Sequence, residues 1–146
     1  SMDVLEVTKD NYQELIEIWE ASVRATHDFL PEESILELKP LILQHYFDAV
    51  ALRCTKQGEK ISGFIGVADS NIEMLFIKPQ HFGEGIGRNL VKHAVDNLNA
   101  SKVDVNEQNP NAIGFYEKVG FKKVGRSELD GQGKPFPLIH MVRKGI

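Results

Sequence analysis

The fold is decided by residues 72–90, which read IEMLFIKPQHFGEGIGRNL. Residues 72–77 are apolar apart from Glu73 and predict a strand, Pro79 ends that strand, and an amphipathic helix is expected to begin near Gly85. Three glycines alternate in the turn between them, where a bare Cα lets a ligand approach the backbone. Because free backbone N–H groups and the positive end of the helix dipole converge there, the turn favours an anionic phosphate.

Two other phosphate-binding motifs do not fit this turn. A dinucleotide-binding fingerprint needs G-x-G-x-x-G, but Gly83, Gly85 and Gly87 give G-x-G-x-G, and Arg88 stands where the third glycine should fall. A P-loop needs Gly-Lys-Ser or Gly-Lys-Thr, and the chain offers Gly-Arg-Asn. The remaining alternative to a phosphate site is a tight turn that binds nothing.

The residues before this stretch predict two helices and then strands. Apolar side chains recur at helical spacing over residues 12–25, with Asp10 as the expected N-cap. A second helix is expected to open at Pro31 and to be kinked or divided at Pro40. Three runs then predict an antiparallel meander: residues 49–55, 61–68 and 72–77.

Helices and strands alternate after the glycine turn. The expected elements are a helix over residues 85–98, a strand at Val103 and Val105, a helix over residues 110–119, and strands around Val124 and Ile139. The last two strands are expected to be joined across the glycine-rich residues 130–135. The predicted fold class is therefore α+β, with helices packed against a central mixed sheet.

The composition limits the class of protein and its partners. The 146 residues are 42% hydrophobic and 26% charged with a net charge of −4, which suits a single domain over residues 2–146. Because we find neither a membrane-length apolar run nor a signal peptide, we expect a cytoplasmic protein with no membrane partner. The lack of a long basic cluster argues against nucleic acid. The single cysteine, Cys54, is expected to be a buried structural thiol.

A second motif makes the interpretation specific. Residues 109–121 read NPNAIGFYEKVGF and match the pattern N-x-x-A-x-x-F-Y-x-x-x-G-F at every fixed position. With the glycine turn, in this order and separation, they resemble the signature of the GNAT superfamily of N-acetyltransferases, and other details resemble a bacterial, uncharacterised branch. The resemblance implies a central, mixed, mostly antiparallel twisted sheet flanked by about four helices. It also implies acetyl-CoA as a co-substrate.

The resemblance implies which residues bind coenzyme A. The end of a strand at Leu75, Phe76 and Ile77 would pair with the pantetheine arm and polarise the thioester carbonyl. The turn would hold the pyrophosphate through Phe82, Gly83, Glu84, Gly85, Ile86, Gly87 and Arg88. The second motif would contribute Asn109, Phe115 and Tyr116, and Asn109 is also expected to cap a helix that opens at Pro110. The family has Arg or Gln where this chain has Phe82, a change that should cost little affinity if backbone amides bind the phosphates.

Acyl transfer to an amine also requires an acid and a base. The resemblance makes Tyr116 the donor to the leaving thiolate, although a packed aromatic is the alternative. Three residues are candidates for the general base: Glu73 near the strand end, Glu107 before the second motif, and His27 between the first two helices. Each has a simpler interpretation, as a solvated carboxylate or as a histidine that bridges helices.

The predicted activity is direct transfer of an acetyl group to a primary amine, on a small molecule or a peptide, in a ternary complex. The main alternative is a non-catalytic acyl-CoA binding module, and a covalent route through Cys54 is a weaker one. Acceptor choice is expected to depend on residues 26–31 and 130–137. The histidines show no metal-site spacing, so we predict no metal. A monomer and a homodimer are both compatible with the sequence.

Overall fold

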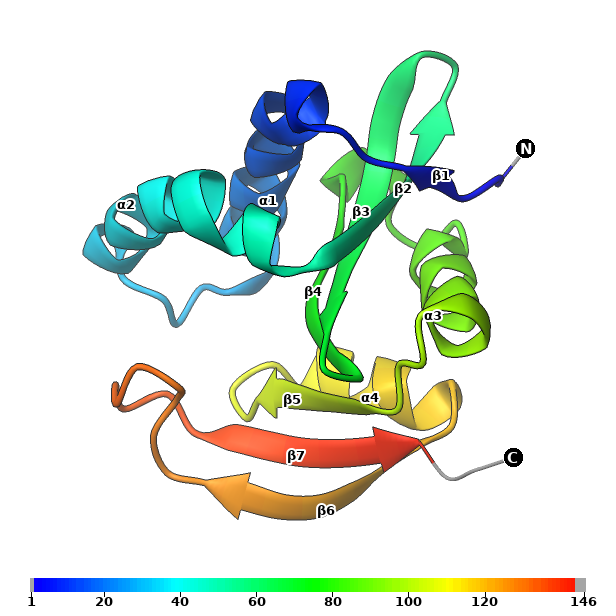
Figure 1. The fold of residues 1–146 in the computed structure, drawn as a ribbon. Helices are drawn as coiled ribbons and strands as arrows, with labels where there is room; N and C mark the ends of the chain where they lie inside the picture. The colour runs from blue at the N-terminus through cyan, green and yellow to red at the C-terminus, as the bar shows by residue number, and fades with distance from the viewer. Residues whose placement is uncertain (1, 144–146) are drawn as a thin grey trace.

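The computed structural model describes residues 2–143, which form one seven-stranded mixed sheet with helices on both faces (Figure 1). The strand order is β1-β2-β3-β4-β5-β7-β6. The strands are β1 (Leu5–Glu6), β2 (Ala51–Gln57), β3 (Lys60–Ala68), β4 (Asn71–Ile77), β5 (Lys102–Asn106), β6 (Phe121–Ser127) and β7 (Leu138–Arg143). The α-helices are α1 (Tyr12–Thr26), α2 (Glu32–Leu41), α3 (Ile86–Asn97) and α4 (Pro110–Lys118). The predicted α+β fold, with a mostly antiparallel sheet, is confirmed.

The start of α1 corrects one prediction. Asp10 is not its N-cap, because Lys9–Asn11 form a short 3-10 turn, η1, and Asn11 stands at the cap position of α1. The backbone N–H of Thr8 donates to Oδ1 of Asn11 over 3.0 Å, so the local polar contact belongs to η1. Asp10 lies within this turn, where a carboxylate also suits the positive end of a helix.

The predicted division at Pro40 is confirmed. This proline lies in the last turn of α2, which passes into a π-helical turn, η2 (Ile42–Tyr46), and a 3-10 turn, η3 (Phe47–Ala49). Proline lacks an N–H and its ring crowds the preceding turn, so a regular helix ends here. The added turns delay β2, which starts at Ala51 rather than at the expected residue 49.

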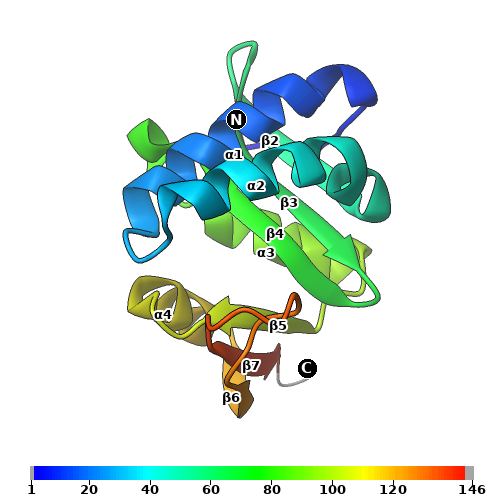
Figure 2. The same cartoon turned by 90° about the vertical axis from the view of Figure 1, so that its left-hand side faces the viewer.

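The sheet separates between β4 and β5. The predicted meander β2-β3-β4 is antiparallel, and β5, β7 and β6 are antiparallel to one another. Between these two parts, β4 and β5 run parallel and pair at two positions alone, Asn71 with Lys102 and Ile72 with Val103. Figure 2 shows the two parts diverging from this junction. The rest of β4 therefore presents an unpaired edge toward β5.

Two apolar cores lie on opposite faces of the sheet. One joins α3 and Tyr116 of α4 to inward residues of β3, β5 and β7. The other joins α1, α2 and η3 to residues of β2, β3 and β4. Cys54 belongs to the second core and is buried, and this desolvation raises the pKa of its thiol. The predicted structural role of this cysteine agrees with its burial.

Candidate active site

A cavity of about 650 Å³ occupies the place where β4 and β5 separate. Its wall combines the end of β4, the facing part of β5, the glycine turn, the start of α4 and the end of α1. Residues from both faces of the sheet therefore meet in one cavity. Every predicted coenzyme A residue except Glu84 contributes to this wall: Leu75, Phe76, Ile77, Phe82, Gly83, Gly85, Ile86, Gly87, Arg88, Asn109, Phe115 and Tyr116.

The glycine turn has the backbone conformation expected of an anion site. Gly83 and Gly85 have φ of 80° and 84°, in the left-handed region that a side chain disfavours. Gly85 is the N-cap of α3, and the N–H of Asn89 donates to its carbonyl over 3.1 Å. The N–H groups of the first three helical residues, 86–88, are left without helical acceptors and are free to bind an anion. Glu84 is not part of the cavity wall, and its carboxylate meets Nδ1 of His81 at 3.1 Å.

The third glycine of the turn has a packing role. A Cβ placed on Gly87 would lie 3.3 Å from the ring of Phe115, so a hydrogen is what allows α3 and α4 to approach closely. Gly87 comes from the first sequence motif and Phe115 from the second. The two motifs are therefore in direct contact at the cavity.

Phe82 occupies the position that differs from the family pattern. Its side chain is 45% exposed and forms part of the cavity wall. A phenyl ring offers no hydrogen bond to a phosphate, so the groups that could donate at this point are the free backbone amides of the turn.

Asn109 caps α4 as predicted. Its Oδ1 accepts from the N–H of Ala112 over 3.2 Å, and Pro110 follows at the first helical position. Because the side chain also lies on the cavity wall, its amide nitrogen is available to a ligand. The cap orients α4 so that Tyr116, two turns along, faces the cavity.

Tyr116 is buried in an aromatic cluster. Its ring packs edge-on against Phe115 and Phe121, with centroid distances of 5.1 and 5.5 Å. Burial raises the pKa of the phenol well above its ordinary value of 10.0, so the group is protonated at neutral pH. Its hydroxyl makes no hydrogen bond to residues 2–143 and is not sealed from solvent, so its proton is free to point into the cavity.

His27 reaches the same cavity from the end of α1. The hydroxyl of Thr26 donates to the carbonyl of Ser22 over 2.8 Å and lies 2.7 Å from Nδ1 of His27. Because that hydroxyl has given its single proton to Ser22, Nδ1 must carry the proton between them. Nε2 then keeps a lone pair. Desolvation lowers the pKa of His27, so the imidazole is neutral at pH 7.

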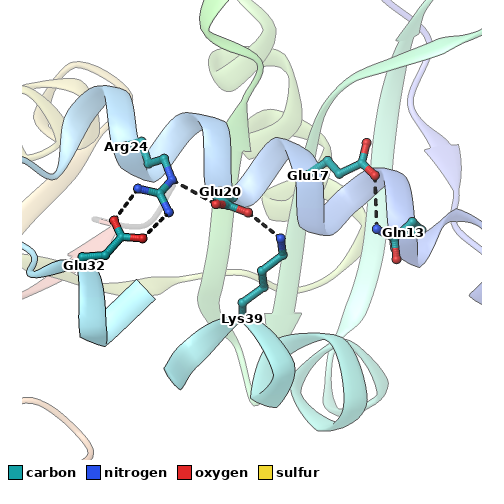
Figure 3. A network of polar contacts seen from close by, with 6 residues as sticks. All are labelled: Gln13, Glu17, Glu20, Arg24, Glu32 and Lys39. Atoms are coloured by element: carbon teal, nitrogen blue, oxygen red, sulfur yellow. Dashed lines mark hydrogen bonds and ion pairs between the residues drawn. The ribbon is translucent and has the colours of Figure 1, made fainter. Parts of the chain in front are cut away.

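Ion pairs join α1, which ends at His27, to α2 (Figure 3). Arg24 on α1 donates to both carboxylate oxygens of Glu32 on α2, over 2.6 and 2.9 Å, and to Glu20 over 2.9 Å. Glu20 also accepts from Lys39 of α2 over 2.6 Å. A bidentate contact shared through a network orients the two helices more firmly than an isolated surface pair.

The two candidate carboxylates have different surroundings. Glu73 lies on the cavity wall and accepts from the side chain of Asn71. It is the extra residue of a β-bulge, because Gly66 and Val67 pair with Met74 and Ile72. Glu107 is not part of the wall and makes a bidentate contact with Arg126, over 2.6 and 3.0 Å. This contact lowers the pKa of Glu107.

Sequence reasoning missed Asp104, which also forms part of the cavity wall. Its Oδ1 lies 2.5 Å from Nδ1 of His140, and Nε2 of His140 lies 2.6 Å from Oγ of Ser127. Alternation along β5 places Asp104 on the face opposite Val103 and Val105, a signal readable from the sequence. The pairing with His140 was not readable, because it depends on the register between β5 and β7.

Residues 2–143 contain neither a metal-ligand cluster nor a membrane-spanning helix. No three His, Cys, Asp or Glu side chains gather there as a metal site would require. None of the helices in this range has the length and apolar character needed to cross a membrane.

The fold and the cavity define an acyl-transfer enzyme, and sequence comparison identifies its class. Residues 38–143 match the family described as "Acetyltransferase (GNAT) domain". The chain belongs to the GNAT superfamily and is an acetyl-CoA-dependent N-acetyltransferase. The predicted family, enzyme class and co-substrate are confirmed.

Two curated relatives and two solved structures resemble the chain over most of its length. The chain is 42% identical to peptidyl-lysine N-acetyltransferase YjaB of Escherichia coli (strain K12), over 91% of this chain and 90% of that protein. It is 43% identical to the protein of the same name from Salmonella typhimurium, over 89% and 90%. The solution structure of apo-form YjaB from Escherichia coli has a TM-score of 0.87 at 38% identity, covering 100% of this chain and 99% of that one. A 19% identical PaiA N-acetyltransferase from Thermoplasma acidophilum, solved with coenzyme A, shares the fold with a TM-score of 0.77 over 99% of each chain.

Proposed function

We propose that this enzyme transfers the acetyl group of acetyl-CoA directly to the side-chain amine of a lysine in a peptide or protein. The observation that carries the proposal is the cavity between β4 and β5, whose wall includes Tyr116, the glycine turn and His27. Relatives more than 40% identical are named peptidyl-lysine N-acetyltransferases, which supports this acceptor over a small amine.

Residues of β4 and the glycine turn bind the co-substrate in this proposal. The free amides of residues 86–88 and the dipole of α3 receive the phosphates. The unpaired edge of β4 at Leu75, Phe76 and Ile77 hydrogen-bonds the pantetheine arm as an additional strand would. A backbone N–H on this edge polarises the thioester carbonyl and stabilises the oxyanion that forms during attack.

His27 is the group we propose to deprotonate the acceptor. A lysine amine has a pKa near 10.4, so it arrives as an ammonium and must lose a proton to attack. The ammonium has no lone pair, so it first loses one proton to solvent. Attack by the neutral amine then makes the nitrogen cationic and strongly acidic, and the free lone pair on Nε2 of His27 accepts this second proton. Glu73 is on the same wall and is the alternative base. Glu107 is less suited because Arg126 holds both of its oxygens.

Tyr116 is the group we propose to assist the leaving thiolate. Ordinary phenol and thiol pKa values differ by about 1.5 units, roughly 2 kcal/mol, and burial widens that gap. Full proton transfer from Tyr116 is therefore uphill. A charge-assisted hydrogen bond from its hydroxyl to the developing sulfur anion offsets much of this cost.

Steady-state kinetics with an N-terminally blocked peptide that contains one lysine would test the proposal. We expect thiol release from acetyl-CoA that depends on the peptide, with intersecting double-reciprocal lines, and no release when arginine replaces the lysine. Acetyl-CoA binding without amine-dependent release would instead favour the non-catalytic module. Turnover of spermidine but not of the peptide would reject the protein acceptor.

A further inference from the structure

The acceptor side of the cavity contains a carboxylate held by a chain of side chains. Asp104 of β5 and His140 of β7 are direct cross-strand partners. Oδ1 of Asp104 lies 2.5 Å from Nδ1 of His140, and Nε2 of His140 lies 2.6 Å from Oγ of Ser127 on β6. Both ring nitrogens of the histidine are therefore engaged, which fixes the imidazole and, through it, one oxygen of the carboxylate.

The face of the sheet on which this chain lies follows from the packing of its neighbours. Val103 and Val105, which flank Asp104, pack in the core with α3 and Tyr116. Ile139 and Met141, which flank His140, belong to the same core. Because side chains alternate along a strand, Asp104 and His140 lie on the opposite face. α1 packs on residues of β2, β3 and β4, and His27 at its end lines the same cavity as Asp104.

The same order of groups activates a serine nucleophile in hydrolases, but the orientation here differs. Asp104 forms part of the cavity wall, whereas His140 and Ser127 do not. The carboxylate is thus the end of the chain that meets a ligand. Its second oxygen, Oδ2, makes no hydrogen bond or ion pair within residues 2–143, so it can accept a cation.

We propose that Asp104, positioned by His140 and Ser127, binds the ammonium group of the acceptor before that group loses its proton and attacks. The site would then select cationic primary amines, and Ser127 and His140 would act as positioning residues on β6 and β7, the last two strands at one end of the sheet. The charges on the wall agree with this assignment, because the cationic side chains Arg88 and Lys118 come from α3 and α4 on the other face. The inference rests on the proposed function for the identity of the acceptor.

Asp104→Asn would test the proposal, because it keeps the shape of the side chain and removes its charge. We expect KM for the lysine peptide to rise about tenfold, the effect of losing one hydrogen bond to a charged group. The affinity for acetyl-CoA and kcat should change little. Asp96→Asn is the matched control, since Asp96 pairs with Lys92 on α3 and is not on this wall. An unchanged KM in Asp104→Asn would overturn the proposal.

Variants of His140 separate a positioning role from a merely structural one. His140→Ala should raise KM in the same way, and His140→Asn should restore part of the loss because its amide can donate near the position of Nδ1. A far-downfield imidazole N–H resonance in wild-type protein should vanish in Asp104→Asn. Equal losses of kcat, acetyl-CoA affinity and stability in all these variants would contradict a positioning role for His140.

The two proposals fail in different ways. A wild-type enzyme that acetylates spermidine but not the lysine peptide would overturn the proposal that the acceptor is a protein. The KM of Asp104→Asn would then be measured with spermidine as the acceptor. A wild-type enzyme that acetylates the peptide, with Asp104→Asn indistinguishable from it, would overturn the ammonium site alone.

Discussion

Tyr116 and His27 line the same cavity, one from α4 and one from the end of α1. Their surroundings shift their pKa values in opposite directions, upward for the phenol and downward for the imidazole. Both shifts follow from desolvation, which disfavours the charged form of each group. At neutral pH the phenol therefore keeps its proton and the imidazole keeps its lone pair. These are the protonation states that a donor and a base need before acetyl transfer.

Removing the phenol hydroxyl should affect chemistry but not folding. We expect Tyr116→Phe to lower kcat by about a hundredfold, within the range of general acid–base catalysis. The hydroxyl makes no hydrogen bond within residues 2–143, so the free energy of unfolding should change by less than about 0.5 kcal/mol. Stopped-flow thiol release and chemical denaturation provide the two measurements. A variant with wild-type kcat would remove Tyr116 from the mechanism.

The lowered pKa of His27 predicts a pH profile. A base works when neutral, so kcat/KM should increase with pH through the pKa of His27 and reach its plateau above it. Because burial lowers that pKa, the midpoint should lie below the ordinary value of 6.5. This rise of kcat/KM with pH, the acidic limb of the profile, should disappear in His27→Gln. A limb that persists in this variant would assign it to another group, and Glu73→Gln would be the next variant to measure.

At the scale of elements, the turn between β4 and α3 combines two left-handed glycines with a free helix N-terminus. Gly85→Ala places a Cβ at φ of 84° on the N-cap of α3, and we expect it to destabilise the fold by about 1 kcal/mol and to weaken acetyl-CoA binding. Gly131→Ala is the matched control, because a Cβ there meets nothing within 4 Å. Calorimetric titration and thermal unfolding would measure the difference. Equal behaviour of the two variants would argue against a conformational role for Gly85.

Phe82 tests whether backbone or side chains bind the phosphates. If the free amides supply most of the phosphate contacts, Phe82→Gln should leave the dissociation constant for coenzyme A within about threefold of wild type. A tenfold change in that constant would correspond to about 1.4 kcal/mol of binding free energy. Isothermal titration of both proteins gives this ratio. A gain in affinity of more than tenfold would show that the turn lacks a side-chain contact that the family uses.

The sequence predicted local elements well because their signals are local. The glycine turn, the Pro40 division and the Asn109 cap each depend on a few neighbouring residues. Asp10 was misplaced because an acidic residue fits both an N-cap and a first helical turn. The pairing of Asp104 with His140 depends on the register between two strands. The contact of Glu107 with Arg126 depends on how separate segments of the chain pack together. Such contacts leave no short-range pattern in the chain.

At the scale of the whole molecule, the split sheet joins two antiparallel parts through a short parallel pairing. We expect acetyl-CoA to protect backbone amides of β4 beyond Ile72 from hydrogen exchange, because the pantetheine arm would take up the edge that β5 leaves free. At a hundredfold excess over its dissociation constant it should stabilise the fold by about 2.7 kcal/mol. Exchange measured by mass spectrometry, with and without ligand, would show whether protection is confined to β4, β5 and the glycine turn. Unchanged exchange at β4 would contradict this binding mode.

The position of Cys54 separates direct from covalent transfer. Its thiol is buried in the core beneath α1, and burial raises its pKa, which disfavours a nucleophilic thiolate. We expect Cys54→Ala to lose about 1 kcal/mol or more of stability and to keep wild-type kcat. Mass spectrometry of enzyme mixed with acetyl-CoA alone should show no acetylated cysteine. A stable acetyl-enzyme that the lysine peptide discharges would instead support a covalent route.

The measurement that tests the central claim most directly is thiol release from acetyl-CoA by wild-type enzyme and Tyr116→Phe, each with and without the single-lysine peptide. Direct transfer predicts release by the wild type that requires both the peptide and its lysine, and a large drop in rate with unchanged acetyl-CoA affinity in the variant. Tight binding of acetyl-CoA without peptide-dependent release by the wild type would contradict the claim.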